Sequence, residues 1–106
     1  MSPFIAFDLS IELNRLLSEL RWRSRNADLY RQLRRAASSV SLNLAEGSGR
    51  AGADRRQHFR VARGSALESR ACLLVGHAWG DLDDQALEPV MPVIDRLLRI
   101  LAALSR

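Results

Sequence analysis

The chain has 106 residues, enough for one domain and too few for two independent hydrophobic cores. Hydrophobic residues make up 47% of it and charged residues 26%, which excludes the composition of a disordered protein. No apolar run approaches the roughly 18 residues that a membrane-spanning helix needs, and the first residues lack the features of a secretory signal peptide. A single cysteine, Cys72, excludes an internal disulfide framework. We therefore predict one cytoplasmic domain over residues 1–106, with no membrane partner.

The net charge of +4 is unevenly distributed along the chain. Residues 15–63 hold twelve Arg and four acidic residues, a net charge of +8, whereas the segments on either side each carry −2. The sequence contains no Lys, so every fixed cation is a guanidinium. Guanidinium groups bind phosphates and carboxylates through two parallel hydrogen bonds. Residues 15–63 are therefore the first place to look for an anion-binding surface.

Apolar residues recur every three or four positions in the first half of the chain, which predicts two helices. The first helix is expected near residues 3–25, and its stripe is Leu9, Leu13, Leu16 and Leu20. The second is expected near residues 27–47, and its stripe is Leu29, Leu33, Ala36, Val40 and Leu44. Gly47 is a natural cap for the end of this helix, while Leu42 points away from the stripe.

The second half of the chain predicts two more helices. Asp54 and Gln57 form a capping-box pattern that opens a helix near residues 54–79. A fourth helix is expected near residues 84–104, where Pro89 and Pro92 kink or delay the first turns. No segment alternates with period two, so no sheet is expected. Four helices of this length joined by short turns predict an all-α fold, an antiparallel up-down-up-down four-helix bundle.

The third predicted helix carries two apolar seams. One consists of Val61, Ser65, Glu68, Cys72, Val75 and Trp79, and the other of Phe59, Ala62, Ala66, Ser69 and Leu73. A helix with two seams is flanked on two sides, either by other helices of its own bundle or by a neighbouring subunit. Together with the small size of the chain, this favours a homo-oligomer.

Two segments of the sequence resemble a known bacterial family. Residues 29–50, LYRQLRRAASSVSLNLAEGSGR, and residues 59–68, FRVARGSALE, are similar to the "four helix bundle protein" family. These proteins are often encoded in intervening sequences of 23S rRNA genes, and they are similar to the accessory variability determinants of diversity-generating retroelements. The family's signature falls on six positions of this chain: Asn43, Glu46, Gly47, Gly64, Ser65 and Glu68.

The resemblance implies a fold, an assembly and two partners. Members of the family are four-helix bundles that assemble into homopentamers. The accessory determinants bind nucleic acid and a reverse transcriptase, so the resemblance implies RNA or DNA as a partner. It implies a reverse transcriptase only if this chain is encoded beside a retroelement.

Glu68 is open to two interpretations. It lies in an otherwise apolar seam one turn after Ser65, while Asn43 and Glu46 share one side of the preceding helix. Glu46 and Glu68 could build a catalytic or metal site, or the polar residues could form a buried network that fixes helix register. A di-iron bundle needs Glu-x-x-His pairs, which the sequence lacks. The polar network is therefore the favoured interpretation.

No other pattern indicates catalysis. His58 and His77 lack the spacing of paired metal ligands, and Ser65 has no identifiable base. The Gly-rich loop at residues 47–52 lacks the Gly-Lys-Ser/Thr ending of a nucleotide-binding loop. Cys72 is expected to be buried in its seam, and Trp22 and Trp79 are expected to fill the core. We therefore predict a non-enzymatic protein with no cofactor and no metal.

The arginines provide the functional hypothesis. Those on the outer side of the second helix and around the following turn are candidate phosphate ligands: Arg31, Arg34, Arg35, Arg50, Arg55, Arg56 and Arg60. Arg55 and Arg56 oppose the positive end of a helix dipole, and a bound phosphate would offset that cost. We predict a nucleic-acid-binding accessory protein. The alternative is a structural or protein-interaction scaffold, whose arginines pair with Asp81, Asp83 and Asp84 of another subunit.

Overall fold

The computed structural model describes residues 3–23 and 27–106, and every regular element in these ranges is an α-helix. The prediction of an all-α protein is therefore confirmed. In chain order the elements are α1 (Pro3–Ser18), α2 (Ala27–Ser48), α3 (Gly52–Ala78), α4 (Asp84–Leu87) and α5 (Met91–Leu104). None of these helices is both long enough and apolar enough to cross a membrane.

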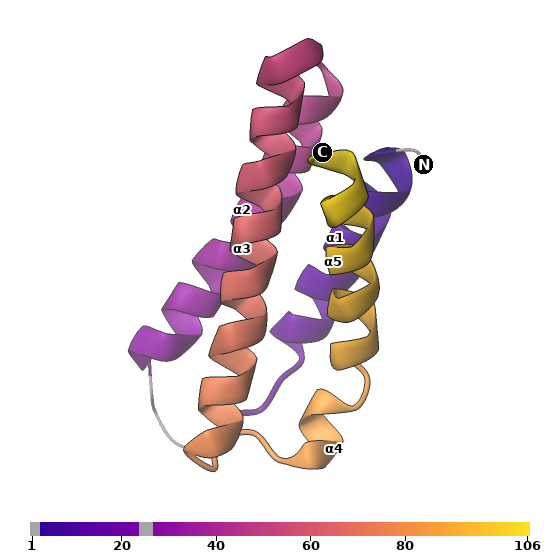
Figure 1. Ribbon diagram of the computed structural model, residues 1–106. Helices are drawn as coiled ribbons and strands as arrows, with labels where there is room; N and C mark the ends of the chain where they lie inside the picture. The colour runs from indigo at the N-terminus through magenta and orange to yellow at the C-terminus, as the bar shows by residue number, and fades with distance from the viewer. Residues whose placement is uncertain (1–2, 24–26) are drawn as a thin grey trace.

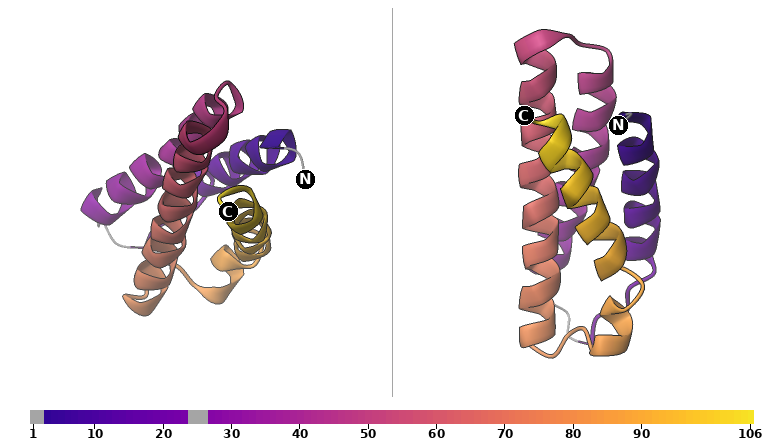
Figure 2. Two further views of the ribbon diagram at one scale, coloured as in Figure 1. Left: turned by 45° about the horizontal axis from the view of Figure 1, so that its top comes forward. Right: turned by 45° about the vertical axis from the view of Figure 1, so that its right-hand side comes forward.

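The four longer helices form a closed ring of contacts around one core. α1 packs against α2, α2 against α3, α3 against α5, and α5 back against α1. Figures 1 and 2 show that the α2–α3 hairpin extends beyond the other helices at the end where α2 turns into α3. The start of α1 and the end of α5 lie on this same side of the molecule. The largest fully buried side chains come from all four helices and include Leu13, Leu33, Leu44, Phe59, Leu73, Ile94, Leu97 and Leu101.

The first helix is shorter than predicted. α1 ends at Ser18 rather than near residue 25, and residues 24 and 25 lie outside the described part of the chain. Trp22 comes nine residues after the buried Leu13, which on a helix of about 3.6 residues per turn is the opposite face. A longer helix would therefore direct the indole into solvent. Because the chain leaves the helix, Trp22 packs against the core instead.

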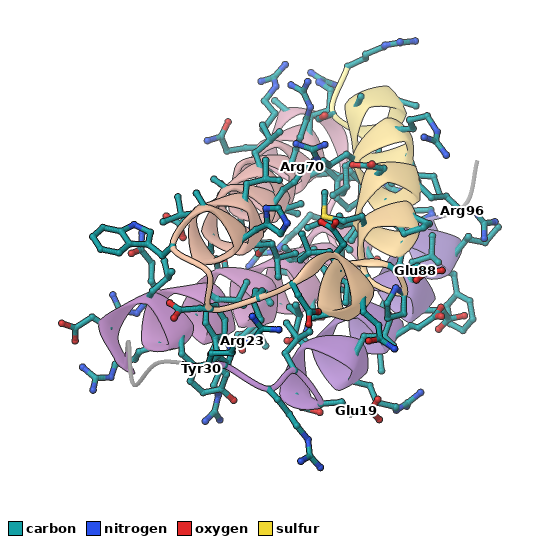
Figure 3. All side chains as sticks on the ribbon, turned by 90° about the horizontal axis from the view of Figure 1, so that it is seen from below. Glu19, Arg23, Tyr30, Arg70, Glu88 and Arg96 are labelled. Carbon is teal, nitrogen blue, oxygen red and sulfur yellow. The ribbon has the colours of Figure 1, made fainter. Side chains whose placement is uncertain are left out.

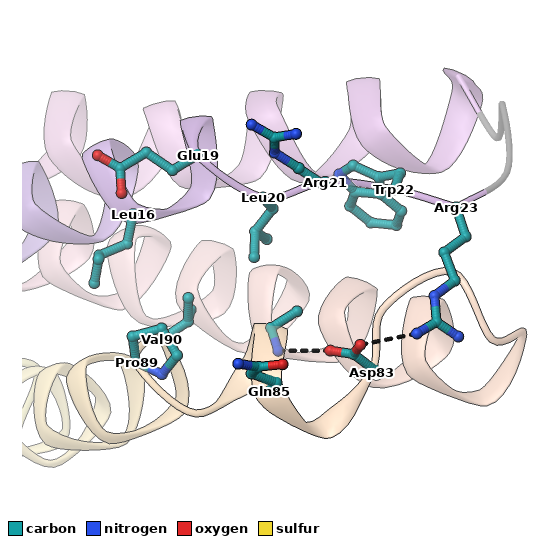
Figure 4. A pocket seen from close by; sticks show the side chains of 11 residues that line it. Leu16, Glu19, Leu20, Arg21, Trp22, Arg23, Asp83, Gln85, Pro89 and Val90 are labelled. Atoms are coloured by element: carbon teal, nitrogen blue, oxygen red, sulfur yellow. Dashed lines mark hydrogen bonds and ion pairs between the residues drawn. The ribbon is translucent and has the colours of Figure 1, made fainter.

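The segment after α1 borders a groove of about 440 Å³ (Figure 4). Leu20 and Trp22 form part of its apolar lining, and Arg23 reaches across to the Asp83 carboxylate at 2.9 Å. Gly76 of α3 gives the indole room, because a Cβ at that position would lie 2.8 Å from the ring of Trp22. The expectation that Trp22 contributes to the core is thus met by a non-helical segment that follows α1.

Gly47 does not cap α2. The helix continues to Ser48, and Gly47 is buried against Phe59 of α3. A Cβ on Gly47 would lie 2.6 Å from Cε1 of Phe59, closer than two carbon atoms approach without displacement. Gly47 therefore allows the close approach of two helices, and its freedom to adopt a left-handed conformation is not used.

The predicted capping box at Asp54 is also wrong. α3 begins at Gly52, and its N-cap residue, Ala51, makes no side-chain capping hydrogen bond. The Asp54 carboxylate instead contacts the Arg50 guanidinium at 3.2 Å. This ion pair across the turn replaces the hydrogen bond that a capping aspartate would accept.

The last predicted helix is divided in two. α4 is a single turn, and Pro89 lies between it and α5, whose second residue is Pro92. Proline lacks the amide hydrogen that a helix interior requires, but it is tolerated in a first turn. The Asp83 side chain caps α4 by accepting a hydrogen bond from the Ala86 amide at 2.8 Å. The prediction of one continuous helix over residues 84–104 is therefore wrong, because the proline-containing segment divides it into two helices instead of kinking or delaying its first turns.

Only one of the two α3 seams is buried. Phe59, Ala62, Ala66, Ser69 and Leu73 all face the core. In the other seam only Cys72 is buried, while Glu68 is exposed and Trp79 keeps 77% of its surface. The expectations of a buried Glu68 and a core-filling Trp79 were wrong. Most of this seam lies on the side of α3 that faces away from the core, so none of the helices in the described ranges covers that part of it.

Replacing Gly47 by Ala tests the close contact between α2 and α3. The added methyl group would have to displace the buried Phe59 ring, so we expect the free energy of unfolding to fall by about 1–3 kcal/mol. Urea denaturation followed by circular dichroism measures the change. Gly49→Ala is the matched control, since its nearest neighbour to an added Cβ is 3.7 Å away; a similar loss in both variants would contradict the packing argument.

Candidate nucleic-acid interface

A polar network joins α2 to α3 close to the signature positions. The Ser65 hydroxyl donates to Ser39 Oγ at 2.8 Å, and Asn43 Nδ2 donates to the same oxygen at 3.1 Å. His58 Nδ1 lies 3.1 Å from Asn43 Oδ1. Asn43 and Ser65 are thus brought together through Ser39, a residue that was not predicted to belong to the network. The network contains no nucleophile adjacent to a base, because His58 contacts Asn43 and not Ser65.

The two signature carboxylates do not belong to this network. Glu46 is exposed and contacts Arg50 at 3.4 Å, and Glu68 is exposed on α3. Of the remaining signature positions, Gly47 contacts Phe59, whereas Gly64 has open space where a Cβ would be. Among the described residues, no cluster of three or more His, Cys, Asp or Glu side chains could hold a metal ion.

Cys72 is buried, as predicted, and its chemistry follows from its position. Burial raises the pKa of the Cys72 thiol above its ordinary value, and the negative charge of Glu68 raises it further. Both effects disfavour the thiolate, which is the reactive form. The thiol is therefore suited to packing and not to nucleophilic attack.

Alkylation of Cys72 tests this environment. At pH 8 we expect iodoacetamide to modify the folded protein much more slowly than the protein unfolded in urea, because the folded thiol is buried and its pKa is raised. Glu68→Gln removes the smaller of the two causes, so it should accelerate the reaction only slightly. Fast modification of the folded wild-type protein, measured by mass spectrometry, would contradict the assignment.

The predicted phosphate ligands fall into two groups at opposite ends of the α2–α3 hairpin. Arg31, Arg34 and Arg35 are exposed near the start of α2. Arg50, Arg55, Arg56 and Arg60 lie around the turn and the start of α3. From Arg34 to Gly47 the rise of the helix is about 20 Å. One short nucleic-acid contact therefore cannot involve all seven side chains.

Two arginines at the turn already have partners. Arg50 contacts both Glu46 and Asp54, so its charge is largely compensated within the chain. The guanidinium carbon of Arg55 lies 5.2 Å from the centroid of the Phe59 ring, a cation–π arrangement. Arg50 is consequently a weaker candidate phosphate ligand than the sequence indicated.

A row of arginines strengthens the candidate surface at the start of α3. Arg56, Arg60 and Arg63 follow one another at spacings of four and three residues, so they share one side of the helix. Arg60 Nε donates to the Ser105 carbonyl oxygen at 3.2 Å, which places the neighbouring Arg106 at the same end. We call Arg56, Arg60, Arg63 and Arg106 the arginine face. Arg63 and Arg106 were not predicted; the spacing could have revealed the first, whereas the second depends on how α5 packs.

The opposite end of the molecule has a mixed charge. Asp83 contacts Arg23, and the Asp84 carboxylate lies 2.7 Å from His77 Nε2, both within the same chain. Of the acidic residues to which the scaffold alternative assigned an intersubunit role, Asp83 and Asp84 thus have contacts within their own chain, although Asp84 stays 98% exposed, and Asp81 is buried. Figure 3 shows this end of the molecule.

In the described part of the chain, some arginines of α3 and α5 have a carboxylate partner and others do not. Arg70 forms an ion pair with Asp95 at 2.8 Å, joining α3 to α5, whereas Arg96 projects outward from α5 (Figure 3). Arg70 therefore has a carboxylate partner on the neighbouring helix, which makes it a weaker candidate phosphate ligand than an unpaired arginine. The arginine face differs from this arrangement, because within the described ranges none of its four members forms an ion pair with a carboxylate.

Comparison with known proteins identifies the family of this chain. No curated protein matches the sequence. A family model described as the 23S rRNA-intervening sequence protein matches residues 5–103, which includes α1 from its third residue to nearly the end of α5. The chain therefore belongs to the 23S rRNA-intervening sequence protein family.

Proposed function

We propose that this protein is a non-enzymatic, oligomeric accessory protein that binds the phosphate backbone of RNA or DNA through its arginine face. In this proposal the subunit is an antiparallel up-down-up-down bundle of α1, α2, α3 and α5 that works in the cytoplasm. The observation that carries the proposal is the grouping of Arg56, Arg60, Arg63 and Arg106 at one end of the molecule, without acidic partners in the described part of the chain. Such a grouping attracts polyanions and is costly without one.

Self-association is the second part of the proposal. Gly64, Leu67, Ala71, Leu74 and Ala78 recur at spacings of three and four residues along the outer side of α3, and all five are exposed. We call them the α3 outer stripe. The side chains of Leu67 and Leu74 keep 47% and 43% of their surface. A heptad-like spacing of exposed leucine and small residues is typical of a helix that packs against another helix. We propose a homopentamer, as the resemblance to the family implies.

Matched arginine variants test nucleic-acid binding. Arg56→Gln, Arg60→Gln and Arg63→Gln are combined in one protein, and Arg31→Gln, Arg34→Gln and Arg35→Gln in another. Both variants have three fewer charges than the wild type, so their net charge is matched. Each phosphate contact that is removed should reduce the slope of log affinity against log salt by about 0.7–0.9. We therefore expect the slope to fall by roughly two units in the first variant and by much less in the second, in filter-binding titrations.

The outcomes separate the two functional classes. Equal losses of affinity in the two variants would indicate a general charge effect instead of a defined surface. No binding by the wild-type protein at low salt would leave the scaffold as the function. A first variant that assembles into smaller species than the wild type would assign the arginine face to a subunit contact.

Polar substitutions on α3 test the assembly. Leu67→Gln with Leu74→Gln should place two unpaired amides in the proposed interface, which is costly when they are buried. We expect light scattering to report smaller species while circular dichroism reports unchanged helicity. Leu42→Gln on α2 is the control, because Leu42 is 66% exposed and lies outside the stripe. A wild-type protein that is monomeric at micromolar concentration would contradict this part of the proposal.

A further inference from the structure

An aromatic groove lies between the start of α1 and the end of α2, close to the turn that carries the arginines. Its volume is about 410 Å³, within the range of small-molecule sites. It is lined by Pro3, Phe4 and Phe7 of α1, by Ala45 and Ser48 of α2, and by Arg55 of α3. We call it the aromatic groove. Its lining is mainly apolar, and Arg55 is the one charged residue among the described residues that line it.

Phe4 presents an accessible aromatic surface at the edge of this groove. The residue keeps 70% of its surface, so its ring is open to a ligand in the groove. Phe7, one turn further along α1, is half-buried and packs against the core, so it provides a fixed second wall. Two phenyl rings and a guanidinium around one groove are the groups on which unstacked nucleobases stack in proteins that bind single strands.

The position of Arg55 is determined by the packing of α2 against α3. Its guanidinium lies over the Phe59 ring, and that ring is held against Gly47. One face of the guanidinium is thus directed to Phe59, while the side chain still lines the groove. Arg56, the next residue of α3, belongs to the arginine face, so the groove and that face meet at the same turn of the helix.

We propose that the aromatic groove accepts one unpaired base of a single-stranded nucleic acid, stacked on Phe4 and contacted by Arg55. This inference rests on the proposed binding of nucleic acid and specifies its class, because a base within a duplex cannot enter the groove. The occupant is identified by chemistry: a flat aromatic ring attached to a phosphate backbone matches phenyl walls next to arginines. Base stacking tolerates every sequence, so little sequence preference is expected.

Substitutions of Phe4 separate stacking from simple apolar contact. Phe4→Ala should lower the affinity for a short single-stranded oligonucleotide by about tenfold, the effect of removing one base–aromatic stack. Its affinity for a duplex of the same sequence and its salt slope should remain unchanged, because every phosphate contact is retained. Phe4→Trp should retain binding, whereas Phe4→Leu, which keeps bulk without an aromatic face, should behave like Phe4→Ala.

The measurement uses oligonucleotides with 2-aminopurine, whose fluorescence changes when the base stacks, together with affinity titrations. Trp79→Ala is the matched control, since Trp79 is 77% exposed and lies at the opposite end of α3. The proposal is overturned if Phe4→Ala and Trp79→Ala bind single strands equally well, or if Phe4→Leu matches the wild type. It is also overturned if Phe4→Ala changes only the oligomeric size, which would identify the groove as a subunit contact.

Failure of the broader proposal gives a different result. A wild-type protein that binds neither single strands nor duplexes contradicts nucleic-acid binding itself, and with it the assignment of this groove. A wild-type protein that binds both forms equally, with a salt slope reduced by the arginine-face variant, retains the proposed function and contradicts only the groove.

Discussion

The contact between Gly47 and Phe59 is the constraint on which the arrangement of this molecule depends. A glycine near the end of α2 lets the backbone of that helix approach a phenyl ring near the start of α3, where any larger residue would meet Cε1 at 2.6 Å. The turn between the helices is short, so this contact sets the depth and register at which α3 packs. The guanidinium of Arg55 lies over the same ring, 5.2 Å from its centroid. A packing contact in the core thus positions a cation at the surface.

Helix α2 lies between two neighbours and makes side-chain hydrogen bonds to both, beside its apolar core stripe. Toward α1, the Ser41 hydroxyl donates to Ser10 Oγ at 2.8 Å, and Asn14 Nδ2 donates to the Ala37 carbonyl oxygen at 3.0 Å. Toward α3, Ser39 accepts from Ser65. Small hydroxyl and methyl side chains let helices approach closely, and buried hydrogen bonds penalise a shifted register because a displaced partner would be left unsatisfied. These interactions specify which turns of the three helices face one another.

The sequence predicted the features that repeat along a single helix, and it missed the features that depend on how two helices pack against each other. The bounds and buried stripe of α2 followed from periodicity, since Leu33, Val40 and Leu44 lie on one side of any regular helix. The role of Gly47 could not be predicted, because it depends on a ring that lies across a turn, on the next helix. Glu68 was misplaced for a related reason: two adjacent stripes of α3 have the same spacing, and only the packing of α2 and α5 decides which is covered.

The sequence also predicted only part of the candidate nucleic-acid-binding surface. Charge alone located the start of α3, but Arg106 joins that surface only because the end of α5 packs beside Arg60. Charge alone also could not reveal that Arg50 is compensated by two carboxylates across the turn. The aromatic groove had no sequence signal, because Phe4 and Arg55 are far apart in the chain and line one groove only through the packing of α2 against both α1 and α3.

Helix α3 connects the two parts of the proposed function. Arg60 precedes Gly64 by one turn, so the arginine face continues directly into the α3 outer stripe along the same side of the helix. If subunits associate through the stripe, the arginines of neighbouring subunits are brought together at one end of the assembly. Like charges at close range oppose association, whereas a bound polyanion removes that cost. Assembly and nucleic-acid binding then favour each other by linkage, since each lowers the free energy required for the other.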